Sequence, residues 1–171
     1  AEQKNDYAAY QLGKLYLRNE EISKDITTAV KWLTFSSVLG NQFAQYALAK
    51  LYLAGEDVQK NIAKAIELLT LSAEQKNEFA EYQLGKVYLS GEDVPKDVEV
   101  AIRWLTAAAK QENGYAEYAL ALVYLTGEDA PKDSVKALSL LKRSAGRGNQ
   151  FAQYRLGKLL LQGEDAPKDV K

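Results

Sequence analysis

The chain has 171 residues, of which 47% are hydrophobic and 26% are charged, so it can bury the core of an ordinary folded domain. It contains no Cys and no His, which excludes disulfides and thiolate chemistry and removes the commonest general base; we therefore expect no metal, no cofactor and no enzymatic activity. Its 22 Lys and Arg balance 23 Asp and Glu, and no segment approaches the roughly 18 apolar residues of a membrane span, so neither nucleic acid nor a membrane is an expected partner.

A period of 36 residues runs through the whole chain. When the chain is aligned with itself, one column holds an aromatic residue followed by alanine: Tyr7, Phe43, Phe79, Tyr115 and Phe151. A second column holds only tyrosine: Tyr10, Tyr46, Tyr82, Tyr118 and Tyr154. A fixed period between about 20 and 50 residues indicates a solenoid, in which each unit stacks on its neighbours.

The period divides the chain into four complete repeats and two partial ones. The complete repeats are 7–42, 43–78, 79–114 and 115–150. Residues 1–6 match the end of a preceding repeat, and 151–171 match the first part of a fifth. Neither end resembles the polar capping repeat that solenoids need for solubility, so we expect the natural array to be longer.

The first part of each repeat is predicted to form a helix, which we name helix A. In residues 43–55, Ala44 and Leu48 recur at the spacing of one apolar helix face. Asn41 precedes this segment as a predicted N-cap. Gly55 ends it, because glycine suits the left-handed conformation that closes many helices.

The second part of each repeat is predicted to contain a connector and a second helix, which we name helix B. The connector GEDVPKD (91–97) has the proline of a turn and ends at Asp97, a predicted N-cap. In residues 61–75, Ala65 and Leu69 lie on one apolar face of helix B. One such pair of helices cannot bury both apolar faces by itself, so the repeats must pack on one another.

A Glu-Asp pair recurs in every connector, as in Glu92 and Asp93. An active site is unique, whereas this pair is present in each repeat. Two adjacent carboxylates without a full loop of oxygen ligands also do not form a calcium site. We interpret the pairs as parts of solvated connectors.

A small residue recurs on one flank of helix A: Gly13, Ala49, Gly85, Ala121 and Gly157. With no side chain larger than a methyl group, these positions predict a close approach of helix A to a neighbouring helix.

The order of residues in each repeat resembles the Sel-one-like repeat (SLR), a relative of the tetratricopeptide repeat. In helix A, an alanine is followed after three residues by Leu-Gly or Leu-Ala, then by a tyrosine and a glycine. The connector comes next, and helix B then carries an alanine with Trp or Leu three residues later. The 36-residue length favours this family over the 34-residue tetratricopeptide repeat. The resemblance implies an all-α fold, a right-handed superhelical α/α solenoid. It also implies an adaptor or scaffold that binds a protein segment in a concave groove lined by helices A.

On a helical wheel the polar residues of helix A fall within one narrow sector, which we expect to face this groove. A tyrosine and a lysine four residues later lie on the same face of this sector. The predicted partner-binding residues are Tyr10, Lys14, Tyr46, Lys50, Tyr82, Gln83, Lys86, Tyr118, Leu122, Tyr154, Arg155 and Lys158. Tyrosine offers apolar area with a polar tip and lysine a mobile charge, so we expect an acidic or aromatic protein segment as partner.

Two alternatives stay open for this sector. The lysines are also the expected solvated side of an amphipathic helix, and the tyrosines suit packing between repeats. In the fourth repeat Leu122 stands in place of lysine, which is interpreted either as an apolar anchor for a ligand side chain or as a neutral replacement.

The fifth helix A carries an apolar face formed by Leu156, Leu159 and Leu160, with no helix B in this chain to cover it. Exposed contiguous apolar area is typical of association sites, so we predict self-association through this end. The alternative function is accordingly a structural spacer or self-associating arm of a larger protein, without a peptide ligand.

Overall fold

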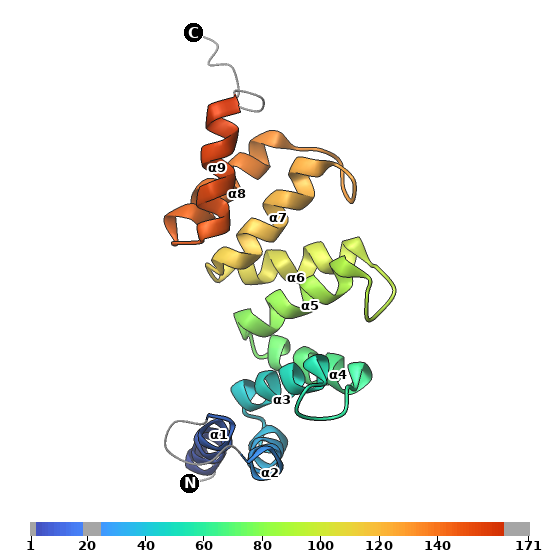
Figure 1. The fold of residues 1–171 in the computed structure, drawn as a ribbon, viewed down its shortest axis with the longest axis vertical. Helices are drawn as coiled ribbons and strands as arrows, with labels where there is room; N and C mark the ends of the chain where they lie inside the picture. The colour runs from blue at the N-terminus through green and yellow to red at the C-terminus, as the bar shows by residue number, and fades with distance from the viewer. Residues whose placement is uncertain (1–2, 19–24, 163–171) are drawn as a thin grey trace. The chain divides into compact units, whose positions relative to one another are not determined.

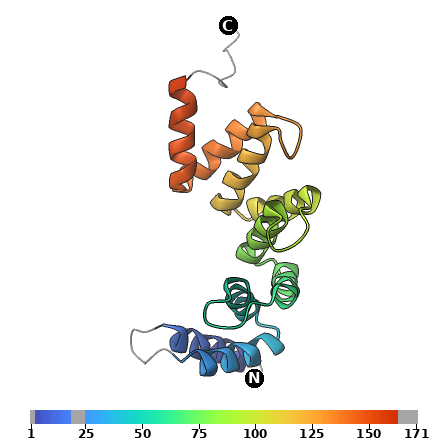
Figure 2. The same ribbon diagram turned by 45° about the vertical axis from the view of Figure 1, so that its right-hand side comes forward.

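The computed structural model describes residues 3–18 and 25–162, and Figures 1 and 2 show the course of the chain from two directions. Within these ranges it has nine helices and no strand, as the sequence predicts. The helices are α1 (Gln3–Leu17), α2 (Ile26–Val38), α3 (Gln42–Ala54), α4 (Ile62–Glu74), α5 (Glu78–Ser90), α6 (Val98–Lys110), α7 (Gly114–Thr126), α8 (Ser134–Gly146) and α9 (Gln150–Gln162). The odd-numbered helices are helices A and the even-numbered ones are helices B.

The helices form two compact units, Ala1–Glu81 and Tyr82–Lys171, and the division falls within α5. In the first unit α2 packs against both α1 and α3, and α3 packs against α4. In the second unit α7 packs against α6 and α8, and α8 packs against α9. Figures 1 and 2 show how the connector between α7 and α8 reverses the chain, so that the two helices of one repeat form a hairpin.

The predicted ends of the helices are confirmed. The Asn41 side chain accepts a hydrogen bond from the backbone N–H of Ala44 at 3.0 Å, and the Asp97 side chain accepts one from Val100 at 2.9 Å. Gly55 follows α3 with a φ of 69°, in the left-handed region. The same roles recur at Asn77, Asn113 and Asn149 as N-caps and at Gly91 and Gly127 as helix ends. The corresponding Gly163 lies outside the described residues.

The start of the chain differs from the repeat alignment. Later in the chain a residue with positive φ separates each helix B from the next helix A; these are Gly40, Lys76, Glu112 and Gly148. By contrast α1 runs without a break from Gln3 to Leu17, so residues 3–6 belong to the same helix as the first helix A.

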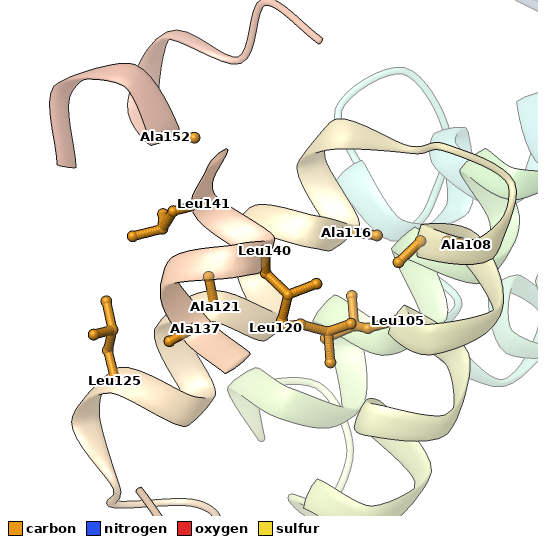
Figure 3. Packing of buried hydrophobic residues seen from close by; sticks show 11 residues of the cluster. Leu105, Ala108, Ala116, Leu120, Ala121, Leu125, Ala137, Leu140, Leu141 and Ala152 are labelled. Atoms are coloured by element: carbon orange, nitrogen blue, oxygen red, sulfur yellow. The ribbon is translucent and has the colours of Figure 1, made fainter. Parts of the chain in front are cut away.

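The core consists of the apolar faces predicted from the helical spacing. In the second unit Leu105 of α6, Leu120 of α7 and Leu140 and Leu141 of α8 belong to one buried cluster, to which α9 contributes Ala152. Figure 3 shows the side chains of Leu105, Leu120 and Leu140 meeting between the helices, with Leu141 on the other side of α8, towards α9. The cluster therefore joins helices from successive repeats of this unit.

The small residues of helix A contact helix B of their own repeat. A Cβ added at Gly13 would lie 2.6 Å from Cγ of Leu33, and one added at Gly85 would lie 2.5 Å from Cγ of Leu105. Ala49 and Ala121, which carry a methyl group at the same place, are fully buried. The predicted close approach thus exists at Gly13 and Gly85, between helices A and B of one repeat, but not at Gly157, where an added Cβ would meet nothing within 4 Å.

Candidate partner-binding faces

Aromatic side chains join successive helices A on one face of each unit. In the first unit the ring centroids of Tyr10 and Phe43 are 5.9 Å apart, and Phe43 is 42% exposed. The equivalent centroid distance is 6.0 Å in three further pairs, which we group with the first as the aromatic pairs: Tyr46 with Phe79, Tyr82 with Tyr115, and Tyr118 with Phe151. In each pair the tyrosine is half-buried and its partner ring is exposed to solvent.

A lysine lies beside the tyrosine in three of the four aromatic pairs. Nζ of Lys14 is 5.2 Å from the ring centroid of Tyr10, and the same distance is 5.8 Å for Lys50 above Tyr46. It is 6.0 Å for Lys86 above the ring of Tyr82. The structure therefore brings together the tyrosines and lysines that the wheel places on one helix face. At these distances the ammonium groups interact with the ring faces.

Tyr46, in one of the aromatic pairs, is partly removed from water. Burial raises the pKa of Tyr46, because removing the phenol from water disfavours its charged form. Its hydroxyl therefore remains protonated at neutral pH and can both donate and accept a hydrogen bond.

The exposed charges on helices A are all basic in the described part of the chain. Lys50, Lys86 and Lys158 are exposed, whereas the first-turn acids Asp6 and Glu78 are half-buried. The two further acids of helices A, Glu81 and Glu117, are buried. Although the whole chain is nearly neutral, the helices A of each unit present positive charge and aromatic rings.

The buried acid Glu117 is engaged inside the protein. Its Oε1 lies 2.6 Å from NH2 of Arg143 on α8, and its Oε2 lies 3.3 Å from Nε of Arg147, the C-cap residue of α8. In the first unit Gln45 occupies the equivalent position and accepts a hydrogen bond from Nε2 of Gln75 at 2.9 Å. Both contacts join a helix A to the helix B that follows it by 30 residues.

The fourth repeat departs from the tyrosine–lysine pattern. Leu122 of α7, in place of a lysine, is half-buried, as is Ala119. Arg155 of α9 is also half-buried, and its Nε is buried without a hydrogen-bond partner in the described part of the chain. Gln83, another predicted residue of this sector, is half-buried on α5.

The remaining predicted residues lie on α9. Tyr154 is 75% exposed and lines a hollow of about 500 Å³ together with Gln153, Gly157, Lys158 and Leu161. Of the leucines predicted for self-association, Leu160 is 63% exposed, whereas Leu156 and Leu159 are half-buried and Leu159 contacts the core cluster. The most exposed leucine is Leu161, which the sequence analysis did not select.

Sequence reasoning missed the second member of every aromatic pair. Phe43, Phe79, Tyr115 and Phe151 served only to define the period. Their position two residues after the N-cap of helix A was the available signal, since a large apolar residue in a first turn is free to reach the neighbouring helix. A second set of tyrosines pairs with helix B instead: Nζ of Lys64 is 5.5 Å from the ring centroid of Tyr52, and Nζ of Lys136 is 4.0 Å from that of Tyr124.

The carboxylates of the connectors take part in contacts within the protein. Asp129 forms an ion pair with Lys96 of the preceding connector, so its carboxylate links two repeats. No group of three or more metal-ligating acidic side chains occurs in residues 3–18 and 25–162. Over the same stretch, no helix combines the length and the apolarity that crossing a bilayer requires.

Comparison with known proteins identifies the repeat. The Sel1 repeat family matches residues 6–41, 42–77, 79–113, 114–149 and 150–171. No curated protein sequence matches the chain.

Solved structures show the same architecture. A Sel1 repeat protein from Oxalobacter formigenes is 28% identical with a TM-score of 0.90, over 99% of this chain and 69% of that one. The protective antigen c5321 of uropathogenic Escherichia coli, which displays an SLR fold, is 27% identical with a TM-score of 0.89; the alignment covers 99% of this chain and 36% of the antigen. This chain thus spans about a third of the antigen's length. With five matched repeats and nine helices in the described residues, this chain belongs to the Sel1 repeat family of α-solenoids.

Proposed function

We propose that this chain is a protein-interaction scaffold whose partner segment lies against the aromatic pairs and their lysines. The observation that carries the proposal is the combination of exposed rings with exposed charges of one sign on helices A. Aromatic side chains provide large contact area at low entropic cost, and basic side chains favour a partner with negative charge. The preferred partner is therefore an acidic segment that also carries apolar or aromatic residues.

The other possible interpretation of the lysines, as a solvated helix side, explains less of the structure. Two of the helices B, α4 and α6, carry exposed acids beside their lysines, as Glu99 accompanies Lys110 on α6, whereas α2 and α8 carry exposed lysines without an acid. The lysines of helices A have no such exposed acid on their own helices, and each of Lys14, Lys50 and Lys86 lies over a ring. This segregation of charge favours a face that receives a partner.

Selection of binders from a random peptide display library tests the proposal. The selected peptides are expected to bind the parent chain and the Lys110→Glu control alike. Binding should weaken by about 1 to 3 kcal/mol in the double variant Tyr82→Ala, Lys86→Glu, because both changes lie on the proposed face. Equal affinity for the double variant and the parent would refute the assignment of this face.

A second candidate function is a self-associating arm, and the exposed leucines of α9 favour it. Leu160 and Leu161 are 63% and 90% exposed, and a Cβ added at Gly157 would meet nothing within 4 Å. In the interior repeats the equivalent small residue is covered by helix B, as Gly85 is by Leu105. The α9 face of this 171-residue chain is therefore shaped to receive another helix.

A further inference from the structure

Within the second unit the cation beside the aromatic pairs changes from one helix to the next. One turn after Tyr82 of α5 lies Lys86, and one turn after its partner ring Tyr115 of α7 lies Ala119. One turn after Tyr118 of α7 lies Leu122, and one turn after its partner ring Phe151 of α9 lies Arg155. Each pair of neighbouring helices A thus has one cation beyond its aromatic pair. Beyond the first of these aromatic pairs the two residues are Lys86 and Ala119, and beyond the second they are Leu122 and Arg155.

Arg155 differs from the lysines in its burial and in its polar partners. Lys86 is exposed and its charge lies above the ring of Tyr82. Arg155 is half-buried, its Nε is buried without a hydrogen-bond partner, and no ion pair in the described part of the chain includes it. The guanidinium of Arg155 therefore has no acceptor within the described residues, and the part of this half-buried side chain that reaches solvent is available to a ligand that supplies a carboxylate.

Within residues 82–162, helices α7 and α9 offer Arg155 no exposed carboxylate. Glu117 is the one acid of α7 and α9, and it is fully buried against Arg143 and Arg147. A guanidinium presents several N–H donors in a planar fork that matches the two oxygens of a carboxylate. The half-buried Leu122, on the neighbouring helix, supplies apolar surface in place of a second charge.

We infer that Arg155 is the carboxylate anchor of the partner-binding face. It takes the side-chain carboxylate of an Asp or Glu within the partner segment, and the residue next to that acid is apolar and lies against Leu122 and the ring of Phe151. This inference rests on the proposed function and adds the chemistry of one contact to it. Lys158, exposed one turn along α9, contributes charge but is not the anchor.

Matched peptide libraries test this inference on the 171-residue chain. The probe is a set of six-residue peptides, acetylated and amidated, with Leu-Glu fixed at the centre and mixed residues elsewhere. A second set is identical except for Leu-Gln at the centre, and a third has Leu-Gln and a free C-terminal carboxylate. Fluorescence anisotropy is measured for the parent and for Arg155→Gln, Arg155→Lys and Lys158→Gln.

We expect the parent to bind the Leu-Glu set about 10 to 100 times more tightly than the Leu-Gln set, as a charged hydrogen-bonded pair would give. Arg155→Gln should abolish this preference, Arg155→Lys should retain part of it, and Lys158→Gln should leave it in place. Because the Nε of Arg155 has no hydrogen-bond partner in the described residues, the melting temperature of Arg155→Gln should stay close to that of the parent, which separates loss of the anchor from loss of the fold.

The outcomes that overturn the inference differ from those that overturn the proposed function. A Glu preference that survives in Arg155→Gln, or binding of no set by the parent, contradicts the anchor. Equal binding of the free-acid Leu-Gln set and the Leu-Glu set assigns the site to a chain terminus and contradicts the side-chain assignment. If the Tyr82→Ala, Lys86→Glu variant binds library-selected peptides like the parent, the proposed function itself fails.

Discussion

Gly85 of α5 and Leu105 of α6 approach so closely that a Cβ at residue 85 would lie 2.5 Å from Cγ of the leucine. This contact sets the spacing of helices A and B in the third repeat. The equivalent Gly13 makes the same contact with Leu33, whereas Gly157 has open space around it.

The first prediction follows from this contact. Gly85→Leu should lower the free energy of unfolding by about 1 to 3 kcal/mol, because the added side chain forces the two helices apart. Gly157→Leu, the same change at the same repeat position, should cause no loss, and its improved helix propensity should raise stability slightly. Urea denaturation of the two variants beside the parent decides the matter. If the two substitutions have equal effects, the close contact is not important for stability.

The second prediction concerns the buried acid of α7. Glu117→Gln should destabilise the protein by about 1 to 3 kcal/mol, because Arg143 and Arg147 then lose a charged acceptor. The double variant Glu117→Gln, Arg147→Gln recreates the pair formed by Gln45 and Gln75 in the first unit, so it should recover part of that loss. A double variant as unstable as the sum of the two single variants would show that the contacts do not act as a pair.

The third prediction is a dependence of stability on pH. The hydrogen bond from Arg147 and its positive charge hold the pKa of Glu112 below the ordinary value of 4.5. Since the folded state favours the charged carboxylate, this contribution is present above about pH 4.5 and is lost as the pH falls through the lowered pKa. The stability difference between the parent and Glu112→Gln should therefore shrink as the pH is reduced from 7 to about 3. A difference that is constant over this range would contradict the role of this ion pair.

The fourth prediction concerns self-association of the 171-residue chain. Sedimentation at increasing concentration should show a dimer, because Leu160 and Leu161 expose apolar surface on α9. Leu160→Glu combined with Leu161→Glu should restore the monomer, whereas Val135→Glu, at an exposed valine of α8, should leave the dimer intact. A parent that stays monomeric at high concentration rules out the self-associating arm.

The repeat period and the helix ends could be predicted because each depends on neighbours in the sequence. Asn41, Asp97 and Gly55 act within a few residues of their own positions, so their roles follow from local chemistry alone. The spacing of Tyr82 and Lys86 likewise places them on one helix face without knowledge of the fold.

The contacts between helices could not be predicted in the same way. The pairing of Tyr118 with Phe151 and that of Glu117 with Arg147 depend on the angle and offset at which two helices pack. These positions recur in the repeats, but their recurrence does not show which residue of the neighbouring helix each side chain contacts. The buried Nε of Arg155 has no sequence signal at all, since it depends on the packing around one side chain.

Fluorine NMR with 3-fluorotyrosine in all tyrosine positions tests the central claim most directly. On addition of a library-selected peptide, the resonances of Tyr82 and Tyr118 should shift, because these rings belong to the aromatic pairs of the second unit. Tyr52 and Tyr124 are internal controls, since each also lies beside a lysine but packs towards helix B, and their resonances should stay in place. Shifts confined to Tyr52 and Tyr124 would contradict the account and assign binding to the opposite side of helices A.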